Sequence, residues 1–407
     1  MTSDVVVIGG GAAGMLCAAT AAERGLDVIL LEPNRMLGRK LRITGKGRCN
    51  VTNNCDIKTV MANIPTGGKF LYSALNRFSP EDTMNLFENL GVPLKTERGN
   101  RVFPESDRSA DIVEALGDYM EATGVQIVQQ SALEVRMEEG AVAGVVTRSG
   151  VIHTRNVVVC TGGMSYPATG STGAGYQFAK KAGHTIRPCR PSLVPLESSD
   201  GYCAEMQGFS LKNVTLTAFE DEKRIYKELG EMMFTHFGVT GPLVLSASAH
   251  MRNMGKSTYR LEIDLKPALD EEKLDARILR DFEQQKNKEF KNALGGLAGR
   301  TMIPVLVALS GIDPETKVHS ITREQRQALV HLFKHFPVRV SGTRPFAEAI
   351  ITAGGVALEE VNPRTMESKL VSGLYFAGEV LDLDAYTGGF NLQIAWSTAY
   401  VAGNAVN

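Results

Sequence analysis

Three glycines and one acid near the N-terminus have the spacing of a site for phosphate and ribose groups. Gly9, Gly11 and Gly14 form the pattern G-x-G-x-x-G, and Glu32 follows them by about 20 residues. In this pattern the first glycine permits a tight turn, the second lets a pyrophosphate approach the backbone, and the third lets a helix pack on a strand. A carboxylate at the position of Glu32 accepts hydrogen bonds from ribose hydroxyls. Together the four residues predict a dinucleotide site.

Three other side chains could move a proton. His236 lies in the stretch MFTHFGVTGP, where Gly238 and Gly241 let backbone approach a ligand, and Tyr166 and Tyr386 lie in loops. Each of the three is a candidate catalytic acid, and each could instead serve only in packing or ring stacking. The sequence leaves both interpretations open.

The elements that must position the glycines follow a strand–helix–strand order. Residues 5–8 are a short apolar run typical of a buried parallel strand, residues 12–23 are an alanine-rich helix, and residues 26–31 are a second strand that ends at Glu32. The start of such a helix offers free N–H groups and partial positive charge to phosphates. A glycine-rich turn of an ordinary α/β domain is the alternative, and the complete context favours the nucleotide site.

A later segment favours FAD over NAD as the dinucleotide. A hairpin at residues 136–147 and a strand at 150–153 precede a buried strand at 156–160, which ends in the sequence Thr-Gly-Gly. Such a meander followed by a strand is how an FAD fold returns its chain to the cofactor. Residues 170–175 are also rich in glycine, but no strand precedes them. They are therefore expected to form a loop near the cofactor rather than a second nucleotide site.

The C-terminal segment supports the same choice. An apolar strand at residues 374–377 meets Gly378 and Glu379, and two further glycines precede a helix expected from about residue 391 to 402. The amides at the start of this helix would face the flavin edge that gains negative charge on reduction. Three widely separated segments thus fit one FAD.

Cys49 and Cys55 raise the possibility of a redox pair beside the flavin. Their spacing is C-x5-C, whereas the disulfide reductases use C-x4-C in this region. The sequence therefore favours a small, buried Cys49 in a glycine-rich loop. No group of histidines, cysteines and carboxylates has the spacing of metal ligands, so no metal is expected.

Composition sets further limits. The 407 residues suit two domains or one large domain with an insertion, and the 43% hydrophobic content supports a substantial core. The net charge of −1 does not point to a nucleic-acid partner, and no signal peptide or membrane-length apolar run is seen. The six scattered cysteines suit a reducing compartment. We expect a cytoplasmic protein with a small-molecule substrate, and no nucleic-acid or membrane partner; the oligomeric state is not indicated.

The chain is expected to divide at a proline-rich stretch, PCRPSLVP. Residues 1–189 and 345–407 are predicted to form the two parts of an FAD-binding domain, and residues 190–344 an inserted domain that shapes a substrate pocket. Strand-like alternation marks the first part of the insertion. Helices are expected at 270–289, at 294–309 with an interruption at Pro304, and at 322–335 with a threonine cap.

Several long motifs resemble one known group of proteins. The stretches GRKLRITGKGRCNVTN, TGGMSYPATGSTGAGY and FTHFGVTGP, together with the C-terminal segment, resemble the bacterial FAD-dependent oxidoreductases grouped with aminoacetone oxidase and a bile-acid 3-oxo-Δ4/Δ6 reductase. The resemblance spans nearly the whole chain. It implies an α/β fold, namely a Rossmann-type FAD-binding domain of the glutathione reductase type with an inserted mixed β/α domain. Ala174, Ala385 and Ala399 are mild departures from the motifs, and none removes an implied FAD contact.

The resemblance also implies the residues that hold FAD. They are Gly9, Gly11, Ala12, Ala13 and Gly14 at the pyrophosphate; Glu32 and Pro33 at the adenosine ribose; Arg39 and Lys40 beside the nucleotide; Gly45, Arg48, Cys49, Asn50 and Val51 beside the isoalloxazine and ribityl chain; Leu133 at adenine; Thr161 and Gly162 on the adenosine side; Gly378 and Glu379 at the ribityl or pyrophosphate end; and Gly388, Gly389, Phe390, Asn391 and Leu392 at the flavin ring.

The expected activity is hydride transfer between flavin N5 and a small organic substrate, with reduction of an enone-type C=C bond of a steroid or bile acid as the first hypothesis. NAD(P)H is a possible electron donor. An amine oxidase that uses oxygen is one alternative, and a non-catalytic or RNA-modifying flavoprotein is another. The last would need a basic stripe on the insertion, but Lys286, Lys288 and Lys291 there alternate with Glu283 and Glu289, as on a solvated helix face.

Overall fold

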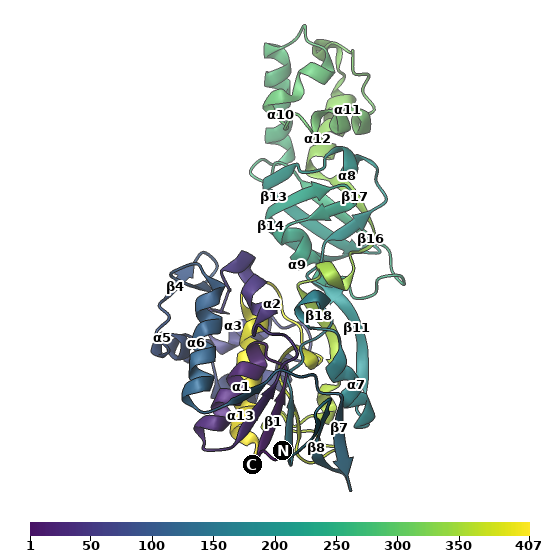
Figure 1. Cartoon of the computed structure of the whole chain (residues 1–407). Coiled ribbons are helices and arrows are strands. Elements are labelled where there is room, and N and C mark those ends of the chain that lie inside the picture. The colour runs from purple at the N-terminus through teal and green to yellow at the C-terminus, as the bar shows by residue number, and fades with distance from the viewer. The chain divides into compact units, whose positions relative to one another are not determined.

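The computed structural model describes residues 1–407, which form two compact units. Residues Met1–Ser192 and Phe346–Asn407 form the first, here called the Rossmann unit, and Leu193–Pro345 form the second, here called the inserted unit. In Figure 1 the colour follows the residue number, so the Rossmann unit is found by its purple, blue and yellow segments and the inserted unit by its green segments. Each unit has its own cluster of buried apolar side chains.

A parallel sheet of five strands is the centre of the Rossmann unit. Its strand order is β19-β10-β1-β2-β6. The strands are β1 (Val5–Ile8), β2 (Val28–Leu31), β6 (Gln126–Val128), β10 (Asn156–Val159) and β19 (Leu374–Phe376). All neighbours in it run parallel. Because helices cover a sheet of this kind on its faces, its strands read as continuous apolar runs, and every residue of β1 and β2 is buried.

Two helices from opposite ends of the chain pack together against this sheet. They are α1 (Ala12–Glu23) and α13 (Phe390–Ala405), drawn in purple and yellow in Figure 1. A side chain at Gly403 would lie 2.8 Å from the Cys17 carbonyl oxygen, so glycine permits this close approach. Arg24 joins the two helices by donating to the carbonyl oxygens of Gly403 (3.0 Å) and Val406 (2.6 Å). The C-terminus is thereby fixed beside the first helix.

Smaller elements complete the Rossmann unit. The expected meander is confirmed and consists of β7 (Glu134–Glu138), β8 (Ala141–Thr147) and β9 (Gly150–His153). A second small sheet contains β3 (Thr52–Asn53), β4 (Leu94–Glu97) and β5 (Arg101–Pro104), and β11 (Ile186–Ser192) pairs antiparallel with β18 (Ile351–Val356). The remaining helices are α2 (Arg39–Ile43), α3 (Ile57–Ala62), α4 (Gly68–Arg77), α5 (Pro80–Asn89), α6 (Ser109–Ala122) and α7 (Ala174–Lys181).

The inserted unit is built on a closed barrel of six strands, in the order β12-β15-β14-β13-β16-β17. The strands are β12 (Leu196–Ser198), β13 (Ser210–Glu220), β14 (Lys223–Thr235), β15 (Gly238–Thr240), β16 (Tyr259–Asp264) and β17 (Phe336–Thr343). Alternate side chains of β16, namely Tyr259, Leu261 and Ile263, are buried, as the interior of a barrel requires. Two helices, α8 (Tyr202–Glu205) and α9 (Pro242–His250), pack against barrel strands β14 and β15.

The rest of the inserted unit is helical and corrects two predicted boundaries. It contains α10 (Glu271–Gln284), α11 (Ile303–Ser310) and α12 (Arg323–Lys334). The cap at Thr322 is confirmed, because its side chain accepts from Gln325 N and the Gln325 side chain accepts in return. The prediction of one helix interrupted at Pro304 is wrong, since Pro304 lies in the first turn of α11, where its missing N–H costs nothing. The helix predicted to reach residue 289 ends at Gln284.

Candidate cofactor-binding pocket

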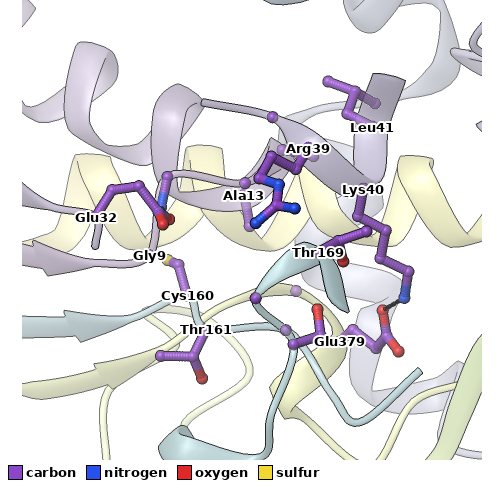
Figure 2. Close-up of a pocket in the computed structure, with 18 of the residues that line it drawn as sticks. Gly9, Ala13, Glu32, Arg39, Lys40, Leu41, Cys160, Thr161, Thr169 and Glu379 are labelled. Atoms are coloured by element: carbon purple, nitrogen blue, oxygen red, sulfur yellow. Dashed lines mark hydrogen bonds and ion pairs between the residues drawn. The ribbon is translucent and has the colours of Figure 1, made fainter. Parts of the chain in front are cut away.

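A pocket opens in the Rossmann unit where β1, β2 and β10 end (Figure 2). One side of it is the glycine loop from Gly9 to Ala13, followed by Glu32 and by Arg39 and Lys40 of α2. The other side comes from the segment after β10, the loop 169–172, the turn at Gly378 and Glu379, and the start of α13. Ligands of open α/β sheets bind at this carboxyl edge of the strands. The topology thus places the glycine loop, Glu32, Arg39 and Lys40 at the edge of the sheet where ligands of this fold bind.

The three glycines of the motif are needed for different structural reasons. A side chain at Gly14 would lie 1.8 Å from the Gly9 carbonyl oxygen, and one at Gly9, whose φ is +108°, would lie 2.6 Å from the Cys160 carbonyl oxygen. These two glycines are therefore required by packing. A side chain at Gly11 would meet nothing within 4 Å and would project into open space in the pocket wall. Gly11 is therefore the position that leaves room for a ligand.

Glu32 holds the glycine loop in shape. Its Oε2 accepts a hydrogen bond from Gly10 N (2.8 Å), and its Oε1 accepts from the backbone and side-chain nitrogens of Asn34 (2.8 and 2.6 Å). Arg39 Nη1 donates in turn to Asn34 Oδ1 (2.6 Å). Both carboxylate oxygens are thus oriented at the mouth of the loop, at the end of the pocket where Figure 2 shows Glu32.

A second polar network lies at the other end of the view in Figure 2. Lys40 Nζ lies 2.5 Å from Glu379 Oε2 and 2.5 Å from Ser165 Oγ, and Ser165 Oγ donates to Glu379 Oε1 (2.7 Å). Thr352 N donates to the same Oε1 at 3.0 Å. Glu379 was predicted to bond the cofactor's ribityl or pyrophosphate end. In this structure its carboxylate is already held by a lysine, a serine and a backbone amide.

The segments predicted to lie at the flavin ring contact one another. With its amide oxygen turned toward Gly389, Asn50 accepts from Gly389 N (2.9 Å), and its nitrogen donates to Thr52 O (3.0 Å). Asn53 Nδ2 donates to Gly388 O (2.9 Å), and Thr52 Oγ1 donates to Gln393 Oε1 (2.6 Å). We call this interface, residues 49–53 with 388–393, the α13 end of the site, and the glycine loop with Glu32 the α1 end.

The pocket brings together many of the predicted cofactor residues. Those that line it are Gly9, Gly11, Ala12, Ala13, Glu32, Pro33, Arg39, Lys40, Thr161, Gly162, Gly378, Glu379, Asn391 and Leu392. Those outside its lining are Gly14, Gly45, Arg48, Cys49, Asn50, Val51, Leu133, Gly388, Gly389 and Phe390. Arg48 instead pairs with Glu97 (2.8 Å) and Asp107 (3.1 Å). Leu133 N donates a hydrogen bond to Val146 O (2.8 Å), and the neighbouring Ser131 and Ala132 line the pocket.

Sequence reasoning missed several lining residues. Ser171 and Thr172 lie in the glycine-rich loop for which the sequence predicts only a position near the cofactor. Ile351 is the first residue of β18 and Ile350 precedes it, shortly after the chain returns to the Rossmann unit at Phe346. The apolar pair carries no motif, so no sequence signal distinguishes it from core. The loop 169–172 carries a usable signal in its glycine, Gly170, and in its three hydroxyl side chains.

None of the three proposed proton donors lines the pocket. Tyr166 is half-buried, has φ +49°, and donates its backbone N–H to Phe346 O (3.0 Å). Tyr386 is half-buried beside Asn391, whose side chain bonds the backbone of Ala385. His236 belongs to the inserted unit, at the turn between β14 and β15.

His236 is exposed, so the interpretation of it as a core histidine is wrong. Its ring contacts Phe237 at 5.1 Å between centroids. The glycines around it are explained by packing, since a side chain at Gly238 would lie 2.3 Å from Leu196 O and one at Gly241 2.9 Å from Met232 Cα. They therefore give no separate support for a ligand beside His236.

All six cysteines are free thiols. Cys49 is fully buried, and burial raises its pKa to about 12; burial, followed by the charge of Asp56, raises the pKa of Cys55 to about 11. Neither thiol is a thiolate near neutral pH, and a thiolate is the form that attacks a disulfide. The pair therefore lacks the electrostatics of a redox centre.

Comparison with known proteins identifies the family. Residues 3–405 match the family described as the HI0933-like protein Rossmann domain. The chain belongs to this family. The "Ribosomal RNA dihydrouridine synthase" of Haemophilus influenzae is 32% identical over 415 residues, which cover 100% of this chain and 98% of that protein. The "3-dehydro-bile acid delta(4,6)-reductase" of Clostridium scindens is 30% identical over 408 residues, 98% of each chain.

A solved structure supports the fold. The 3-ketosteroid delta1-dehydrogenase of Sterolibacterium denitrificans superimposes with a TM-score of 0.54 at 13% identity, covering 100% of this chain and 99% of that one. By its family the protein is an FAD-dependent oxidoreductase. The superposition supports the Rossmann-type fold of its FAD-binding domain. None of its helices combines the length and the apolar character that crossing a bilayer requires.

The chemistry of the pocket fits FAD. Gly11 caps α1 and Gly389 caps α13, and neither cap supplies a side-chain acceptor to the first turn of its helix. Ala12 and Ala13 in the first turn of α1, and Asn391 and Leu392 in the first turn of α13, line the pocket. Free amides at a helix start suit a pyrophosphate in the first case and the electron-rich edge of a flavin in the second.

Proposed function

We propose that this protein is an FAD-dependent reductase of C=C bonds conjugated to a carbonyl group, and that its substrate is a uracil base in RNA. The bond to be reduced is C5=C6 of the base, and the product is dihydrouridine. The observation that carries the choice of RNA is a basic segment that runs along the pocket.

The names of the two relatives describe one kind of chemistry. Dihydrouridine differs from uridine by two hydrogens across a C=C bond that is conjugated to the C4 carbonyl. A delta(4,6)-reductase that acts on a 3-dehydro bile acid also reduces C=C bonds in conjugation with a carbonyl. When a C=C bond is directly conjugated to a carbonyl, as C5=C6 of uracil is, hydride addition occurs at the β carbon and the α carbon takes a proton. When a second C=C bond extends the conjugation, hydride addition can instead occur at the δ carbon.

The basic segment lies between Pro33 and Cys55. It contains six basic side chains and no acidic one, although the whole chain has a net charge of −1. The basic residues are Arg35, Arg39, Lys40, Arg42, Lys46 and Arg48. Arg39 and Lys40 line the pocket, and Arg35 and Lys46 are exposed. Lys40 pairs with Glu379, and Arg48 pairs with Glu97 and Asp107, so the excess positive charge comes from the other four side chains. Such an excess attracts a polyanion, and phosphate contacts dominate affinity for RNA.

In this proposal each part of the pocket has a separate task. FAD supplies the hydride for the β carbon, and NADH or NADPH is the proposed source of its electrons. The glycine loop and Glu32 hold the nucleotide part of the cofactor, and the start of α13 holds the ring. Tyr166 or Tyr386, both in the Rossmann unit, is the proposed donor of the proton to the α carbon. Arg35 and Lys46 bind RNA phosphates.

A 3-oxo enone of the steroid or bile-acid type is the second candidate substrate. It is favoured by the 30% identity to the Clostridium scindens reductase, which spans nearly the whole of both chains. This substrate needs no basic segment, and the two candidates therefore make opposite predictions for charge-reversal variants.

The experiment compares both substrates on one preparation of FAD-loaded protein. The flavin is reduced anaerobically with NADH or NADPH, and its reoxidation is followed with an unmodified ribosomal RNA transcript, with free uridine, and with a 4-ene-3-oxo steroid. We expect reoxidation by the transcript together with a mass gain of two hydrogens in one uridine. Reoxidation by the steroid but not by the transcript would contradict the RNA assignment.

Charge-reversal variants test the role of the basic segment. Lys46→Glu and Arg35→Glu are expected to raise KM for the transcript about tenfold at low salt, and to leave NAD(P)H-driven flavin reduction unchanged. Arg148→Glu is the matched control, because Arg148 is also an exposed basic residue of the Rossmann unit but lies at the turn of the β8–β9 hairpin. Equal effects of all three variants would show that only net charge matters.

A further inference from the structure

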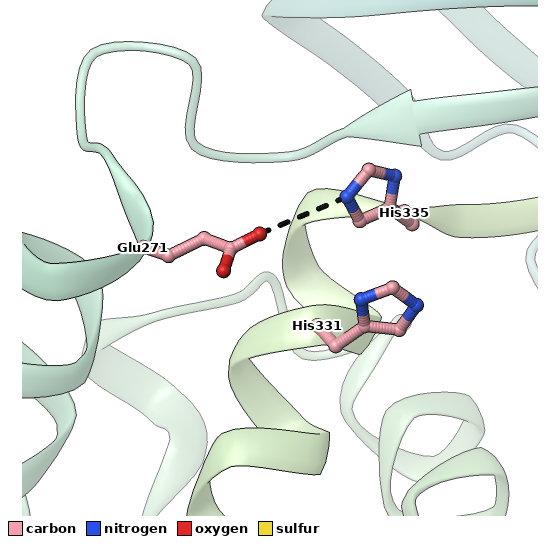
Figure 3. Close-up of side chains that lie close together, drawn as sticks. All are labelled: Glu271, His331 and His335. Atoms are coloured by element: carbon pink, nitrogen blue, oxygen red, sulfur yellow. Dashed lines mark ion pairs between the residues drawn. The ribbon is translucent and has the colours of Figure 1, made fainter.

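A cluster of two histidines and one glutamate in the helical part of the inserted unit lies outside the cofactor site (Figure 3). His331 lies on α12 and His335 is the residue that ends this helix, one turn later, while Glu271 begins α10. One potential ligand atom from each residue lies within 4.8 Å of the others. We propose that Glu271, His331 and His335 form a binding site for Zn²⁺.

The residue types and their spacing suit this ion. Two histidines four residues apart on a helix lie on the same face, and here their ring centroids are 4.6 Å apart. Two imidazoles and one carboxylate from a second helix match the ligand sets that zinc accepts, with a fourth position left for water. The sequence analysis missed the site because Glu271 is 60 residues away and the spacing H-x3-H alone was not read as a ligand pair.

His335 is already oriented as a metal ligand. Its Nδ1 contacts Glu262 Oε2 of β16 at 3.0 Å, and its Nε2 faces Glu271 Oε1 at 3.9 Å. A carboxylate on one ring nitrogen fixes the tautomer and leaves the other nitrogen to bind the metal. Glu262 also pairs with Arg260, so the carboxylate is itself held in place.

Only small movements are needed to close the site. Ligand atoms around a tetrahedral zinc lie about 3.3 Å apart, given bonds of about 2.0–2.1 Å. The distance from His335 Nε2 to Glu271 Oε1, 3.9 Å, must therefore shorten by about 0.6 Å, and no other pair of ligand atoms, all within 4.8 Å, must shorten by more than about 1.5 Å. His331 and Glu271 are exposed. The nearby lysines do not oppose the ion directly, because Lys273 pairs with Asp270 (2.8 Å) and Lys334 with Asp264 (2.6 Å).

Binding would join the start of α10 to the end of α12. The two helices already share the ion pair between Arg326 and Asp275 (2.6 Å), and the metal would add a second link one to two turns away. A ligand that binds only the folded state raises stability in proportion to the logarithm of its concentration. The site is therefore expected to stabilise the helical part of the inserted unit rather than to take part in hydride transfer.

The test is calorimetric titration of ZnCl₂ into the full-length, FAD-loaded protein after treatment with a chelator. We expect one equivalent of zinc to bind, and an excess of MgCl₂ not to compete, because imidazole is a poor ligand for magnesium. His331→Ala and Glu271→Gln should each weaken binding at least tenfold. Glu262→Gln should weaken it about 10- to 100-fold through the orientation of His335.

Two controls keep the result interpretable. His319→Ala removes an exposed histidine of the same unit, whose Nδ1 contacts Lys286 O, and should leave zinc affinity unchanged. Far-ultraviolet circular dichroism and FAD content establish that each variant is folded, and His331→Gln replaces His331→Ala if it is not. Cys55 and Cys189 are the two partly exposed cysteines, so they are the thiols that could bind zinc instead. Zinc affinity within twofold of the parent in both the His331 and Glu271 variants, or its loss in a Cys55→Ser/Cys189→Ser variant, would overturn the proposal.

Discussion

The two ends of the cofactor site are built in opposite ways. The α1 end is an open loop whose glycine at position 11 projects toward empty space, whereas the α13 end is a packed interface in which Asn50, Thr52 and Gln393 bond across about 340 residues of sequence. The same residue type therefore has different functions at the two ends. Gly11 makes room for a ligand, and Gly389 makes room for the protein's own backbone, since a side chain there would lie 2.4 Å from Thr52 C.

The strongest test of this comparison is Gly11→Val. Gly11 has φ −88°, which any residue adopts, so the variant should fold. Its side chain would occupy the space of the pyrophosphate, and we expect FAD binding to be lost completely. The measurements are FAD content by absorbance and thermal unfolding of the apoprotein. Gly14→Ala is the contrast within the same motif, because its Cβ would lie 1.8 Å from Gly9 O and should destroy the fold itself. Full FAD occupancy in Gly11→Val would refute the assignment of the α1 end.

At the α13 end, Gly389→Ala should affect folding before it affects binding. Gly389 has φ +100° and is in close contact with the Thr52 backbone, so alanine is both strained and overpacked. We expect a loss of about 3 kcal/mol in the free energy of unfolding, measured in urea. Gly117→Ala is the matched control, because Gly117 lies within α6 with nothing near its Cβ, and alanine there should stabilise the protein slightly. Equal stability of the two variants would show that the interface is loose.

A smaller effect is expected from Glu32→Ala. The change removes a carboxylate that accepts hydrogen bonds from Gly10 N and Asn34 N and that is the predicted partner of the ribose hydroxyls. FAD affinity should fall by about 1–3 kcal/mol, measured by quenching of flavin fluorescence. The change in the free energy of unfolding of the apoprotein should be smaller than the change in the free energy of FAD binding. A larger effect on unfolding than on FAD binding would mean that Glu32 acts mainly in folding.

The smallest effect is expected from Cys55→Ser. Its pKa is raised to about 11 and that of Cys49 to about 12, so both thiols stay protonated from pH 7 to pH 9. Turnover should be unchanged over this range, and alkylation by iodoacetamide should be slow in the parent protein. Loss of turnover in a variant with full FAD content would show that Cys49 and Cys55 form a redox pair after all.

The difference between the two ends also explains what the sequence could predict. At the α1 end, function depends on backbone shape, which glycine spacing encodes locally, and the residues from Gly9 to Ala13 line the pocket as expected. At the α13 end, the residues from Gly45 to Val51 were placed at the flavin from motif resemblance alone. Their contacts depend on packing between distant segments, which no local pattern encodes, and they do not line the pocket.

The same reasoning applies to the inserted unit. Alternation of apolar and polar residues predicts strands there, and the cap at Thr322 predicts the start of α12. Closure of six strands into a barrel depends on pairing between residues far apart in sequence, such as Leu196 with Thr343, and was not predicted. His236 was considered a possible core residue because its neighbours are apolar, yet it lies at a turn, and turns expose their side chains to solvent.

The chain enters and leaves the inserted unit on paired strands in both units. In the Rossmann unit β11 pairs with β18, with Ser192 opposite Ile351, and in the inserted unit β12 pairs with β17. Residues 193–345 therefore behave as a cassette: replacing them by a short turn would convert β11 and β18 into an ordinary β-hairpin. Because closing a short loop costs little chain entropy, recombination at this point could exchange one cassette for another without rebuilding the dinucleotide fold. Proteins of this fold could thus exchange the cassette in evolution while keeping the same redox cofactor.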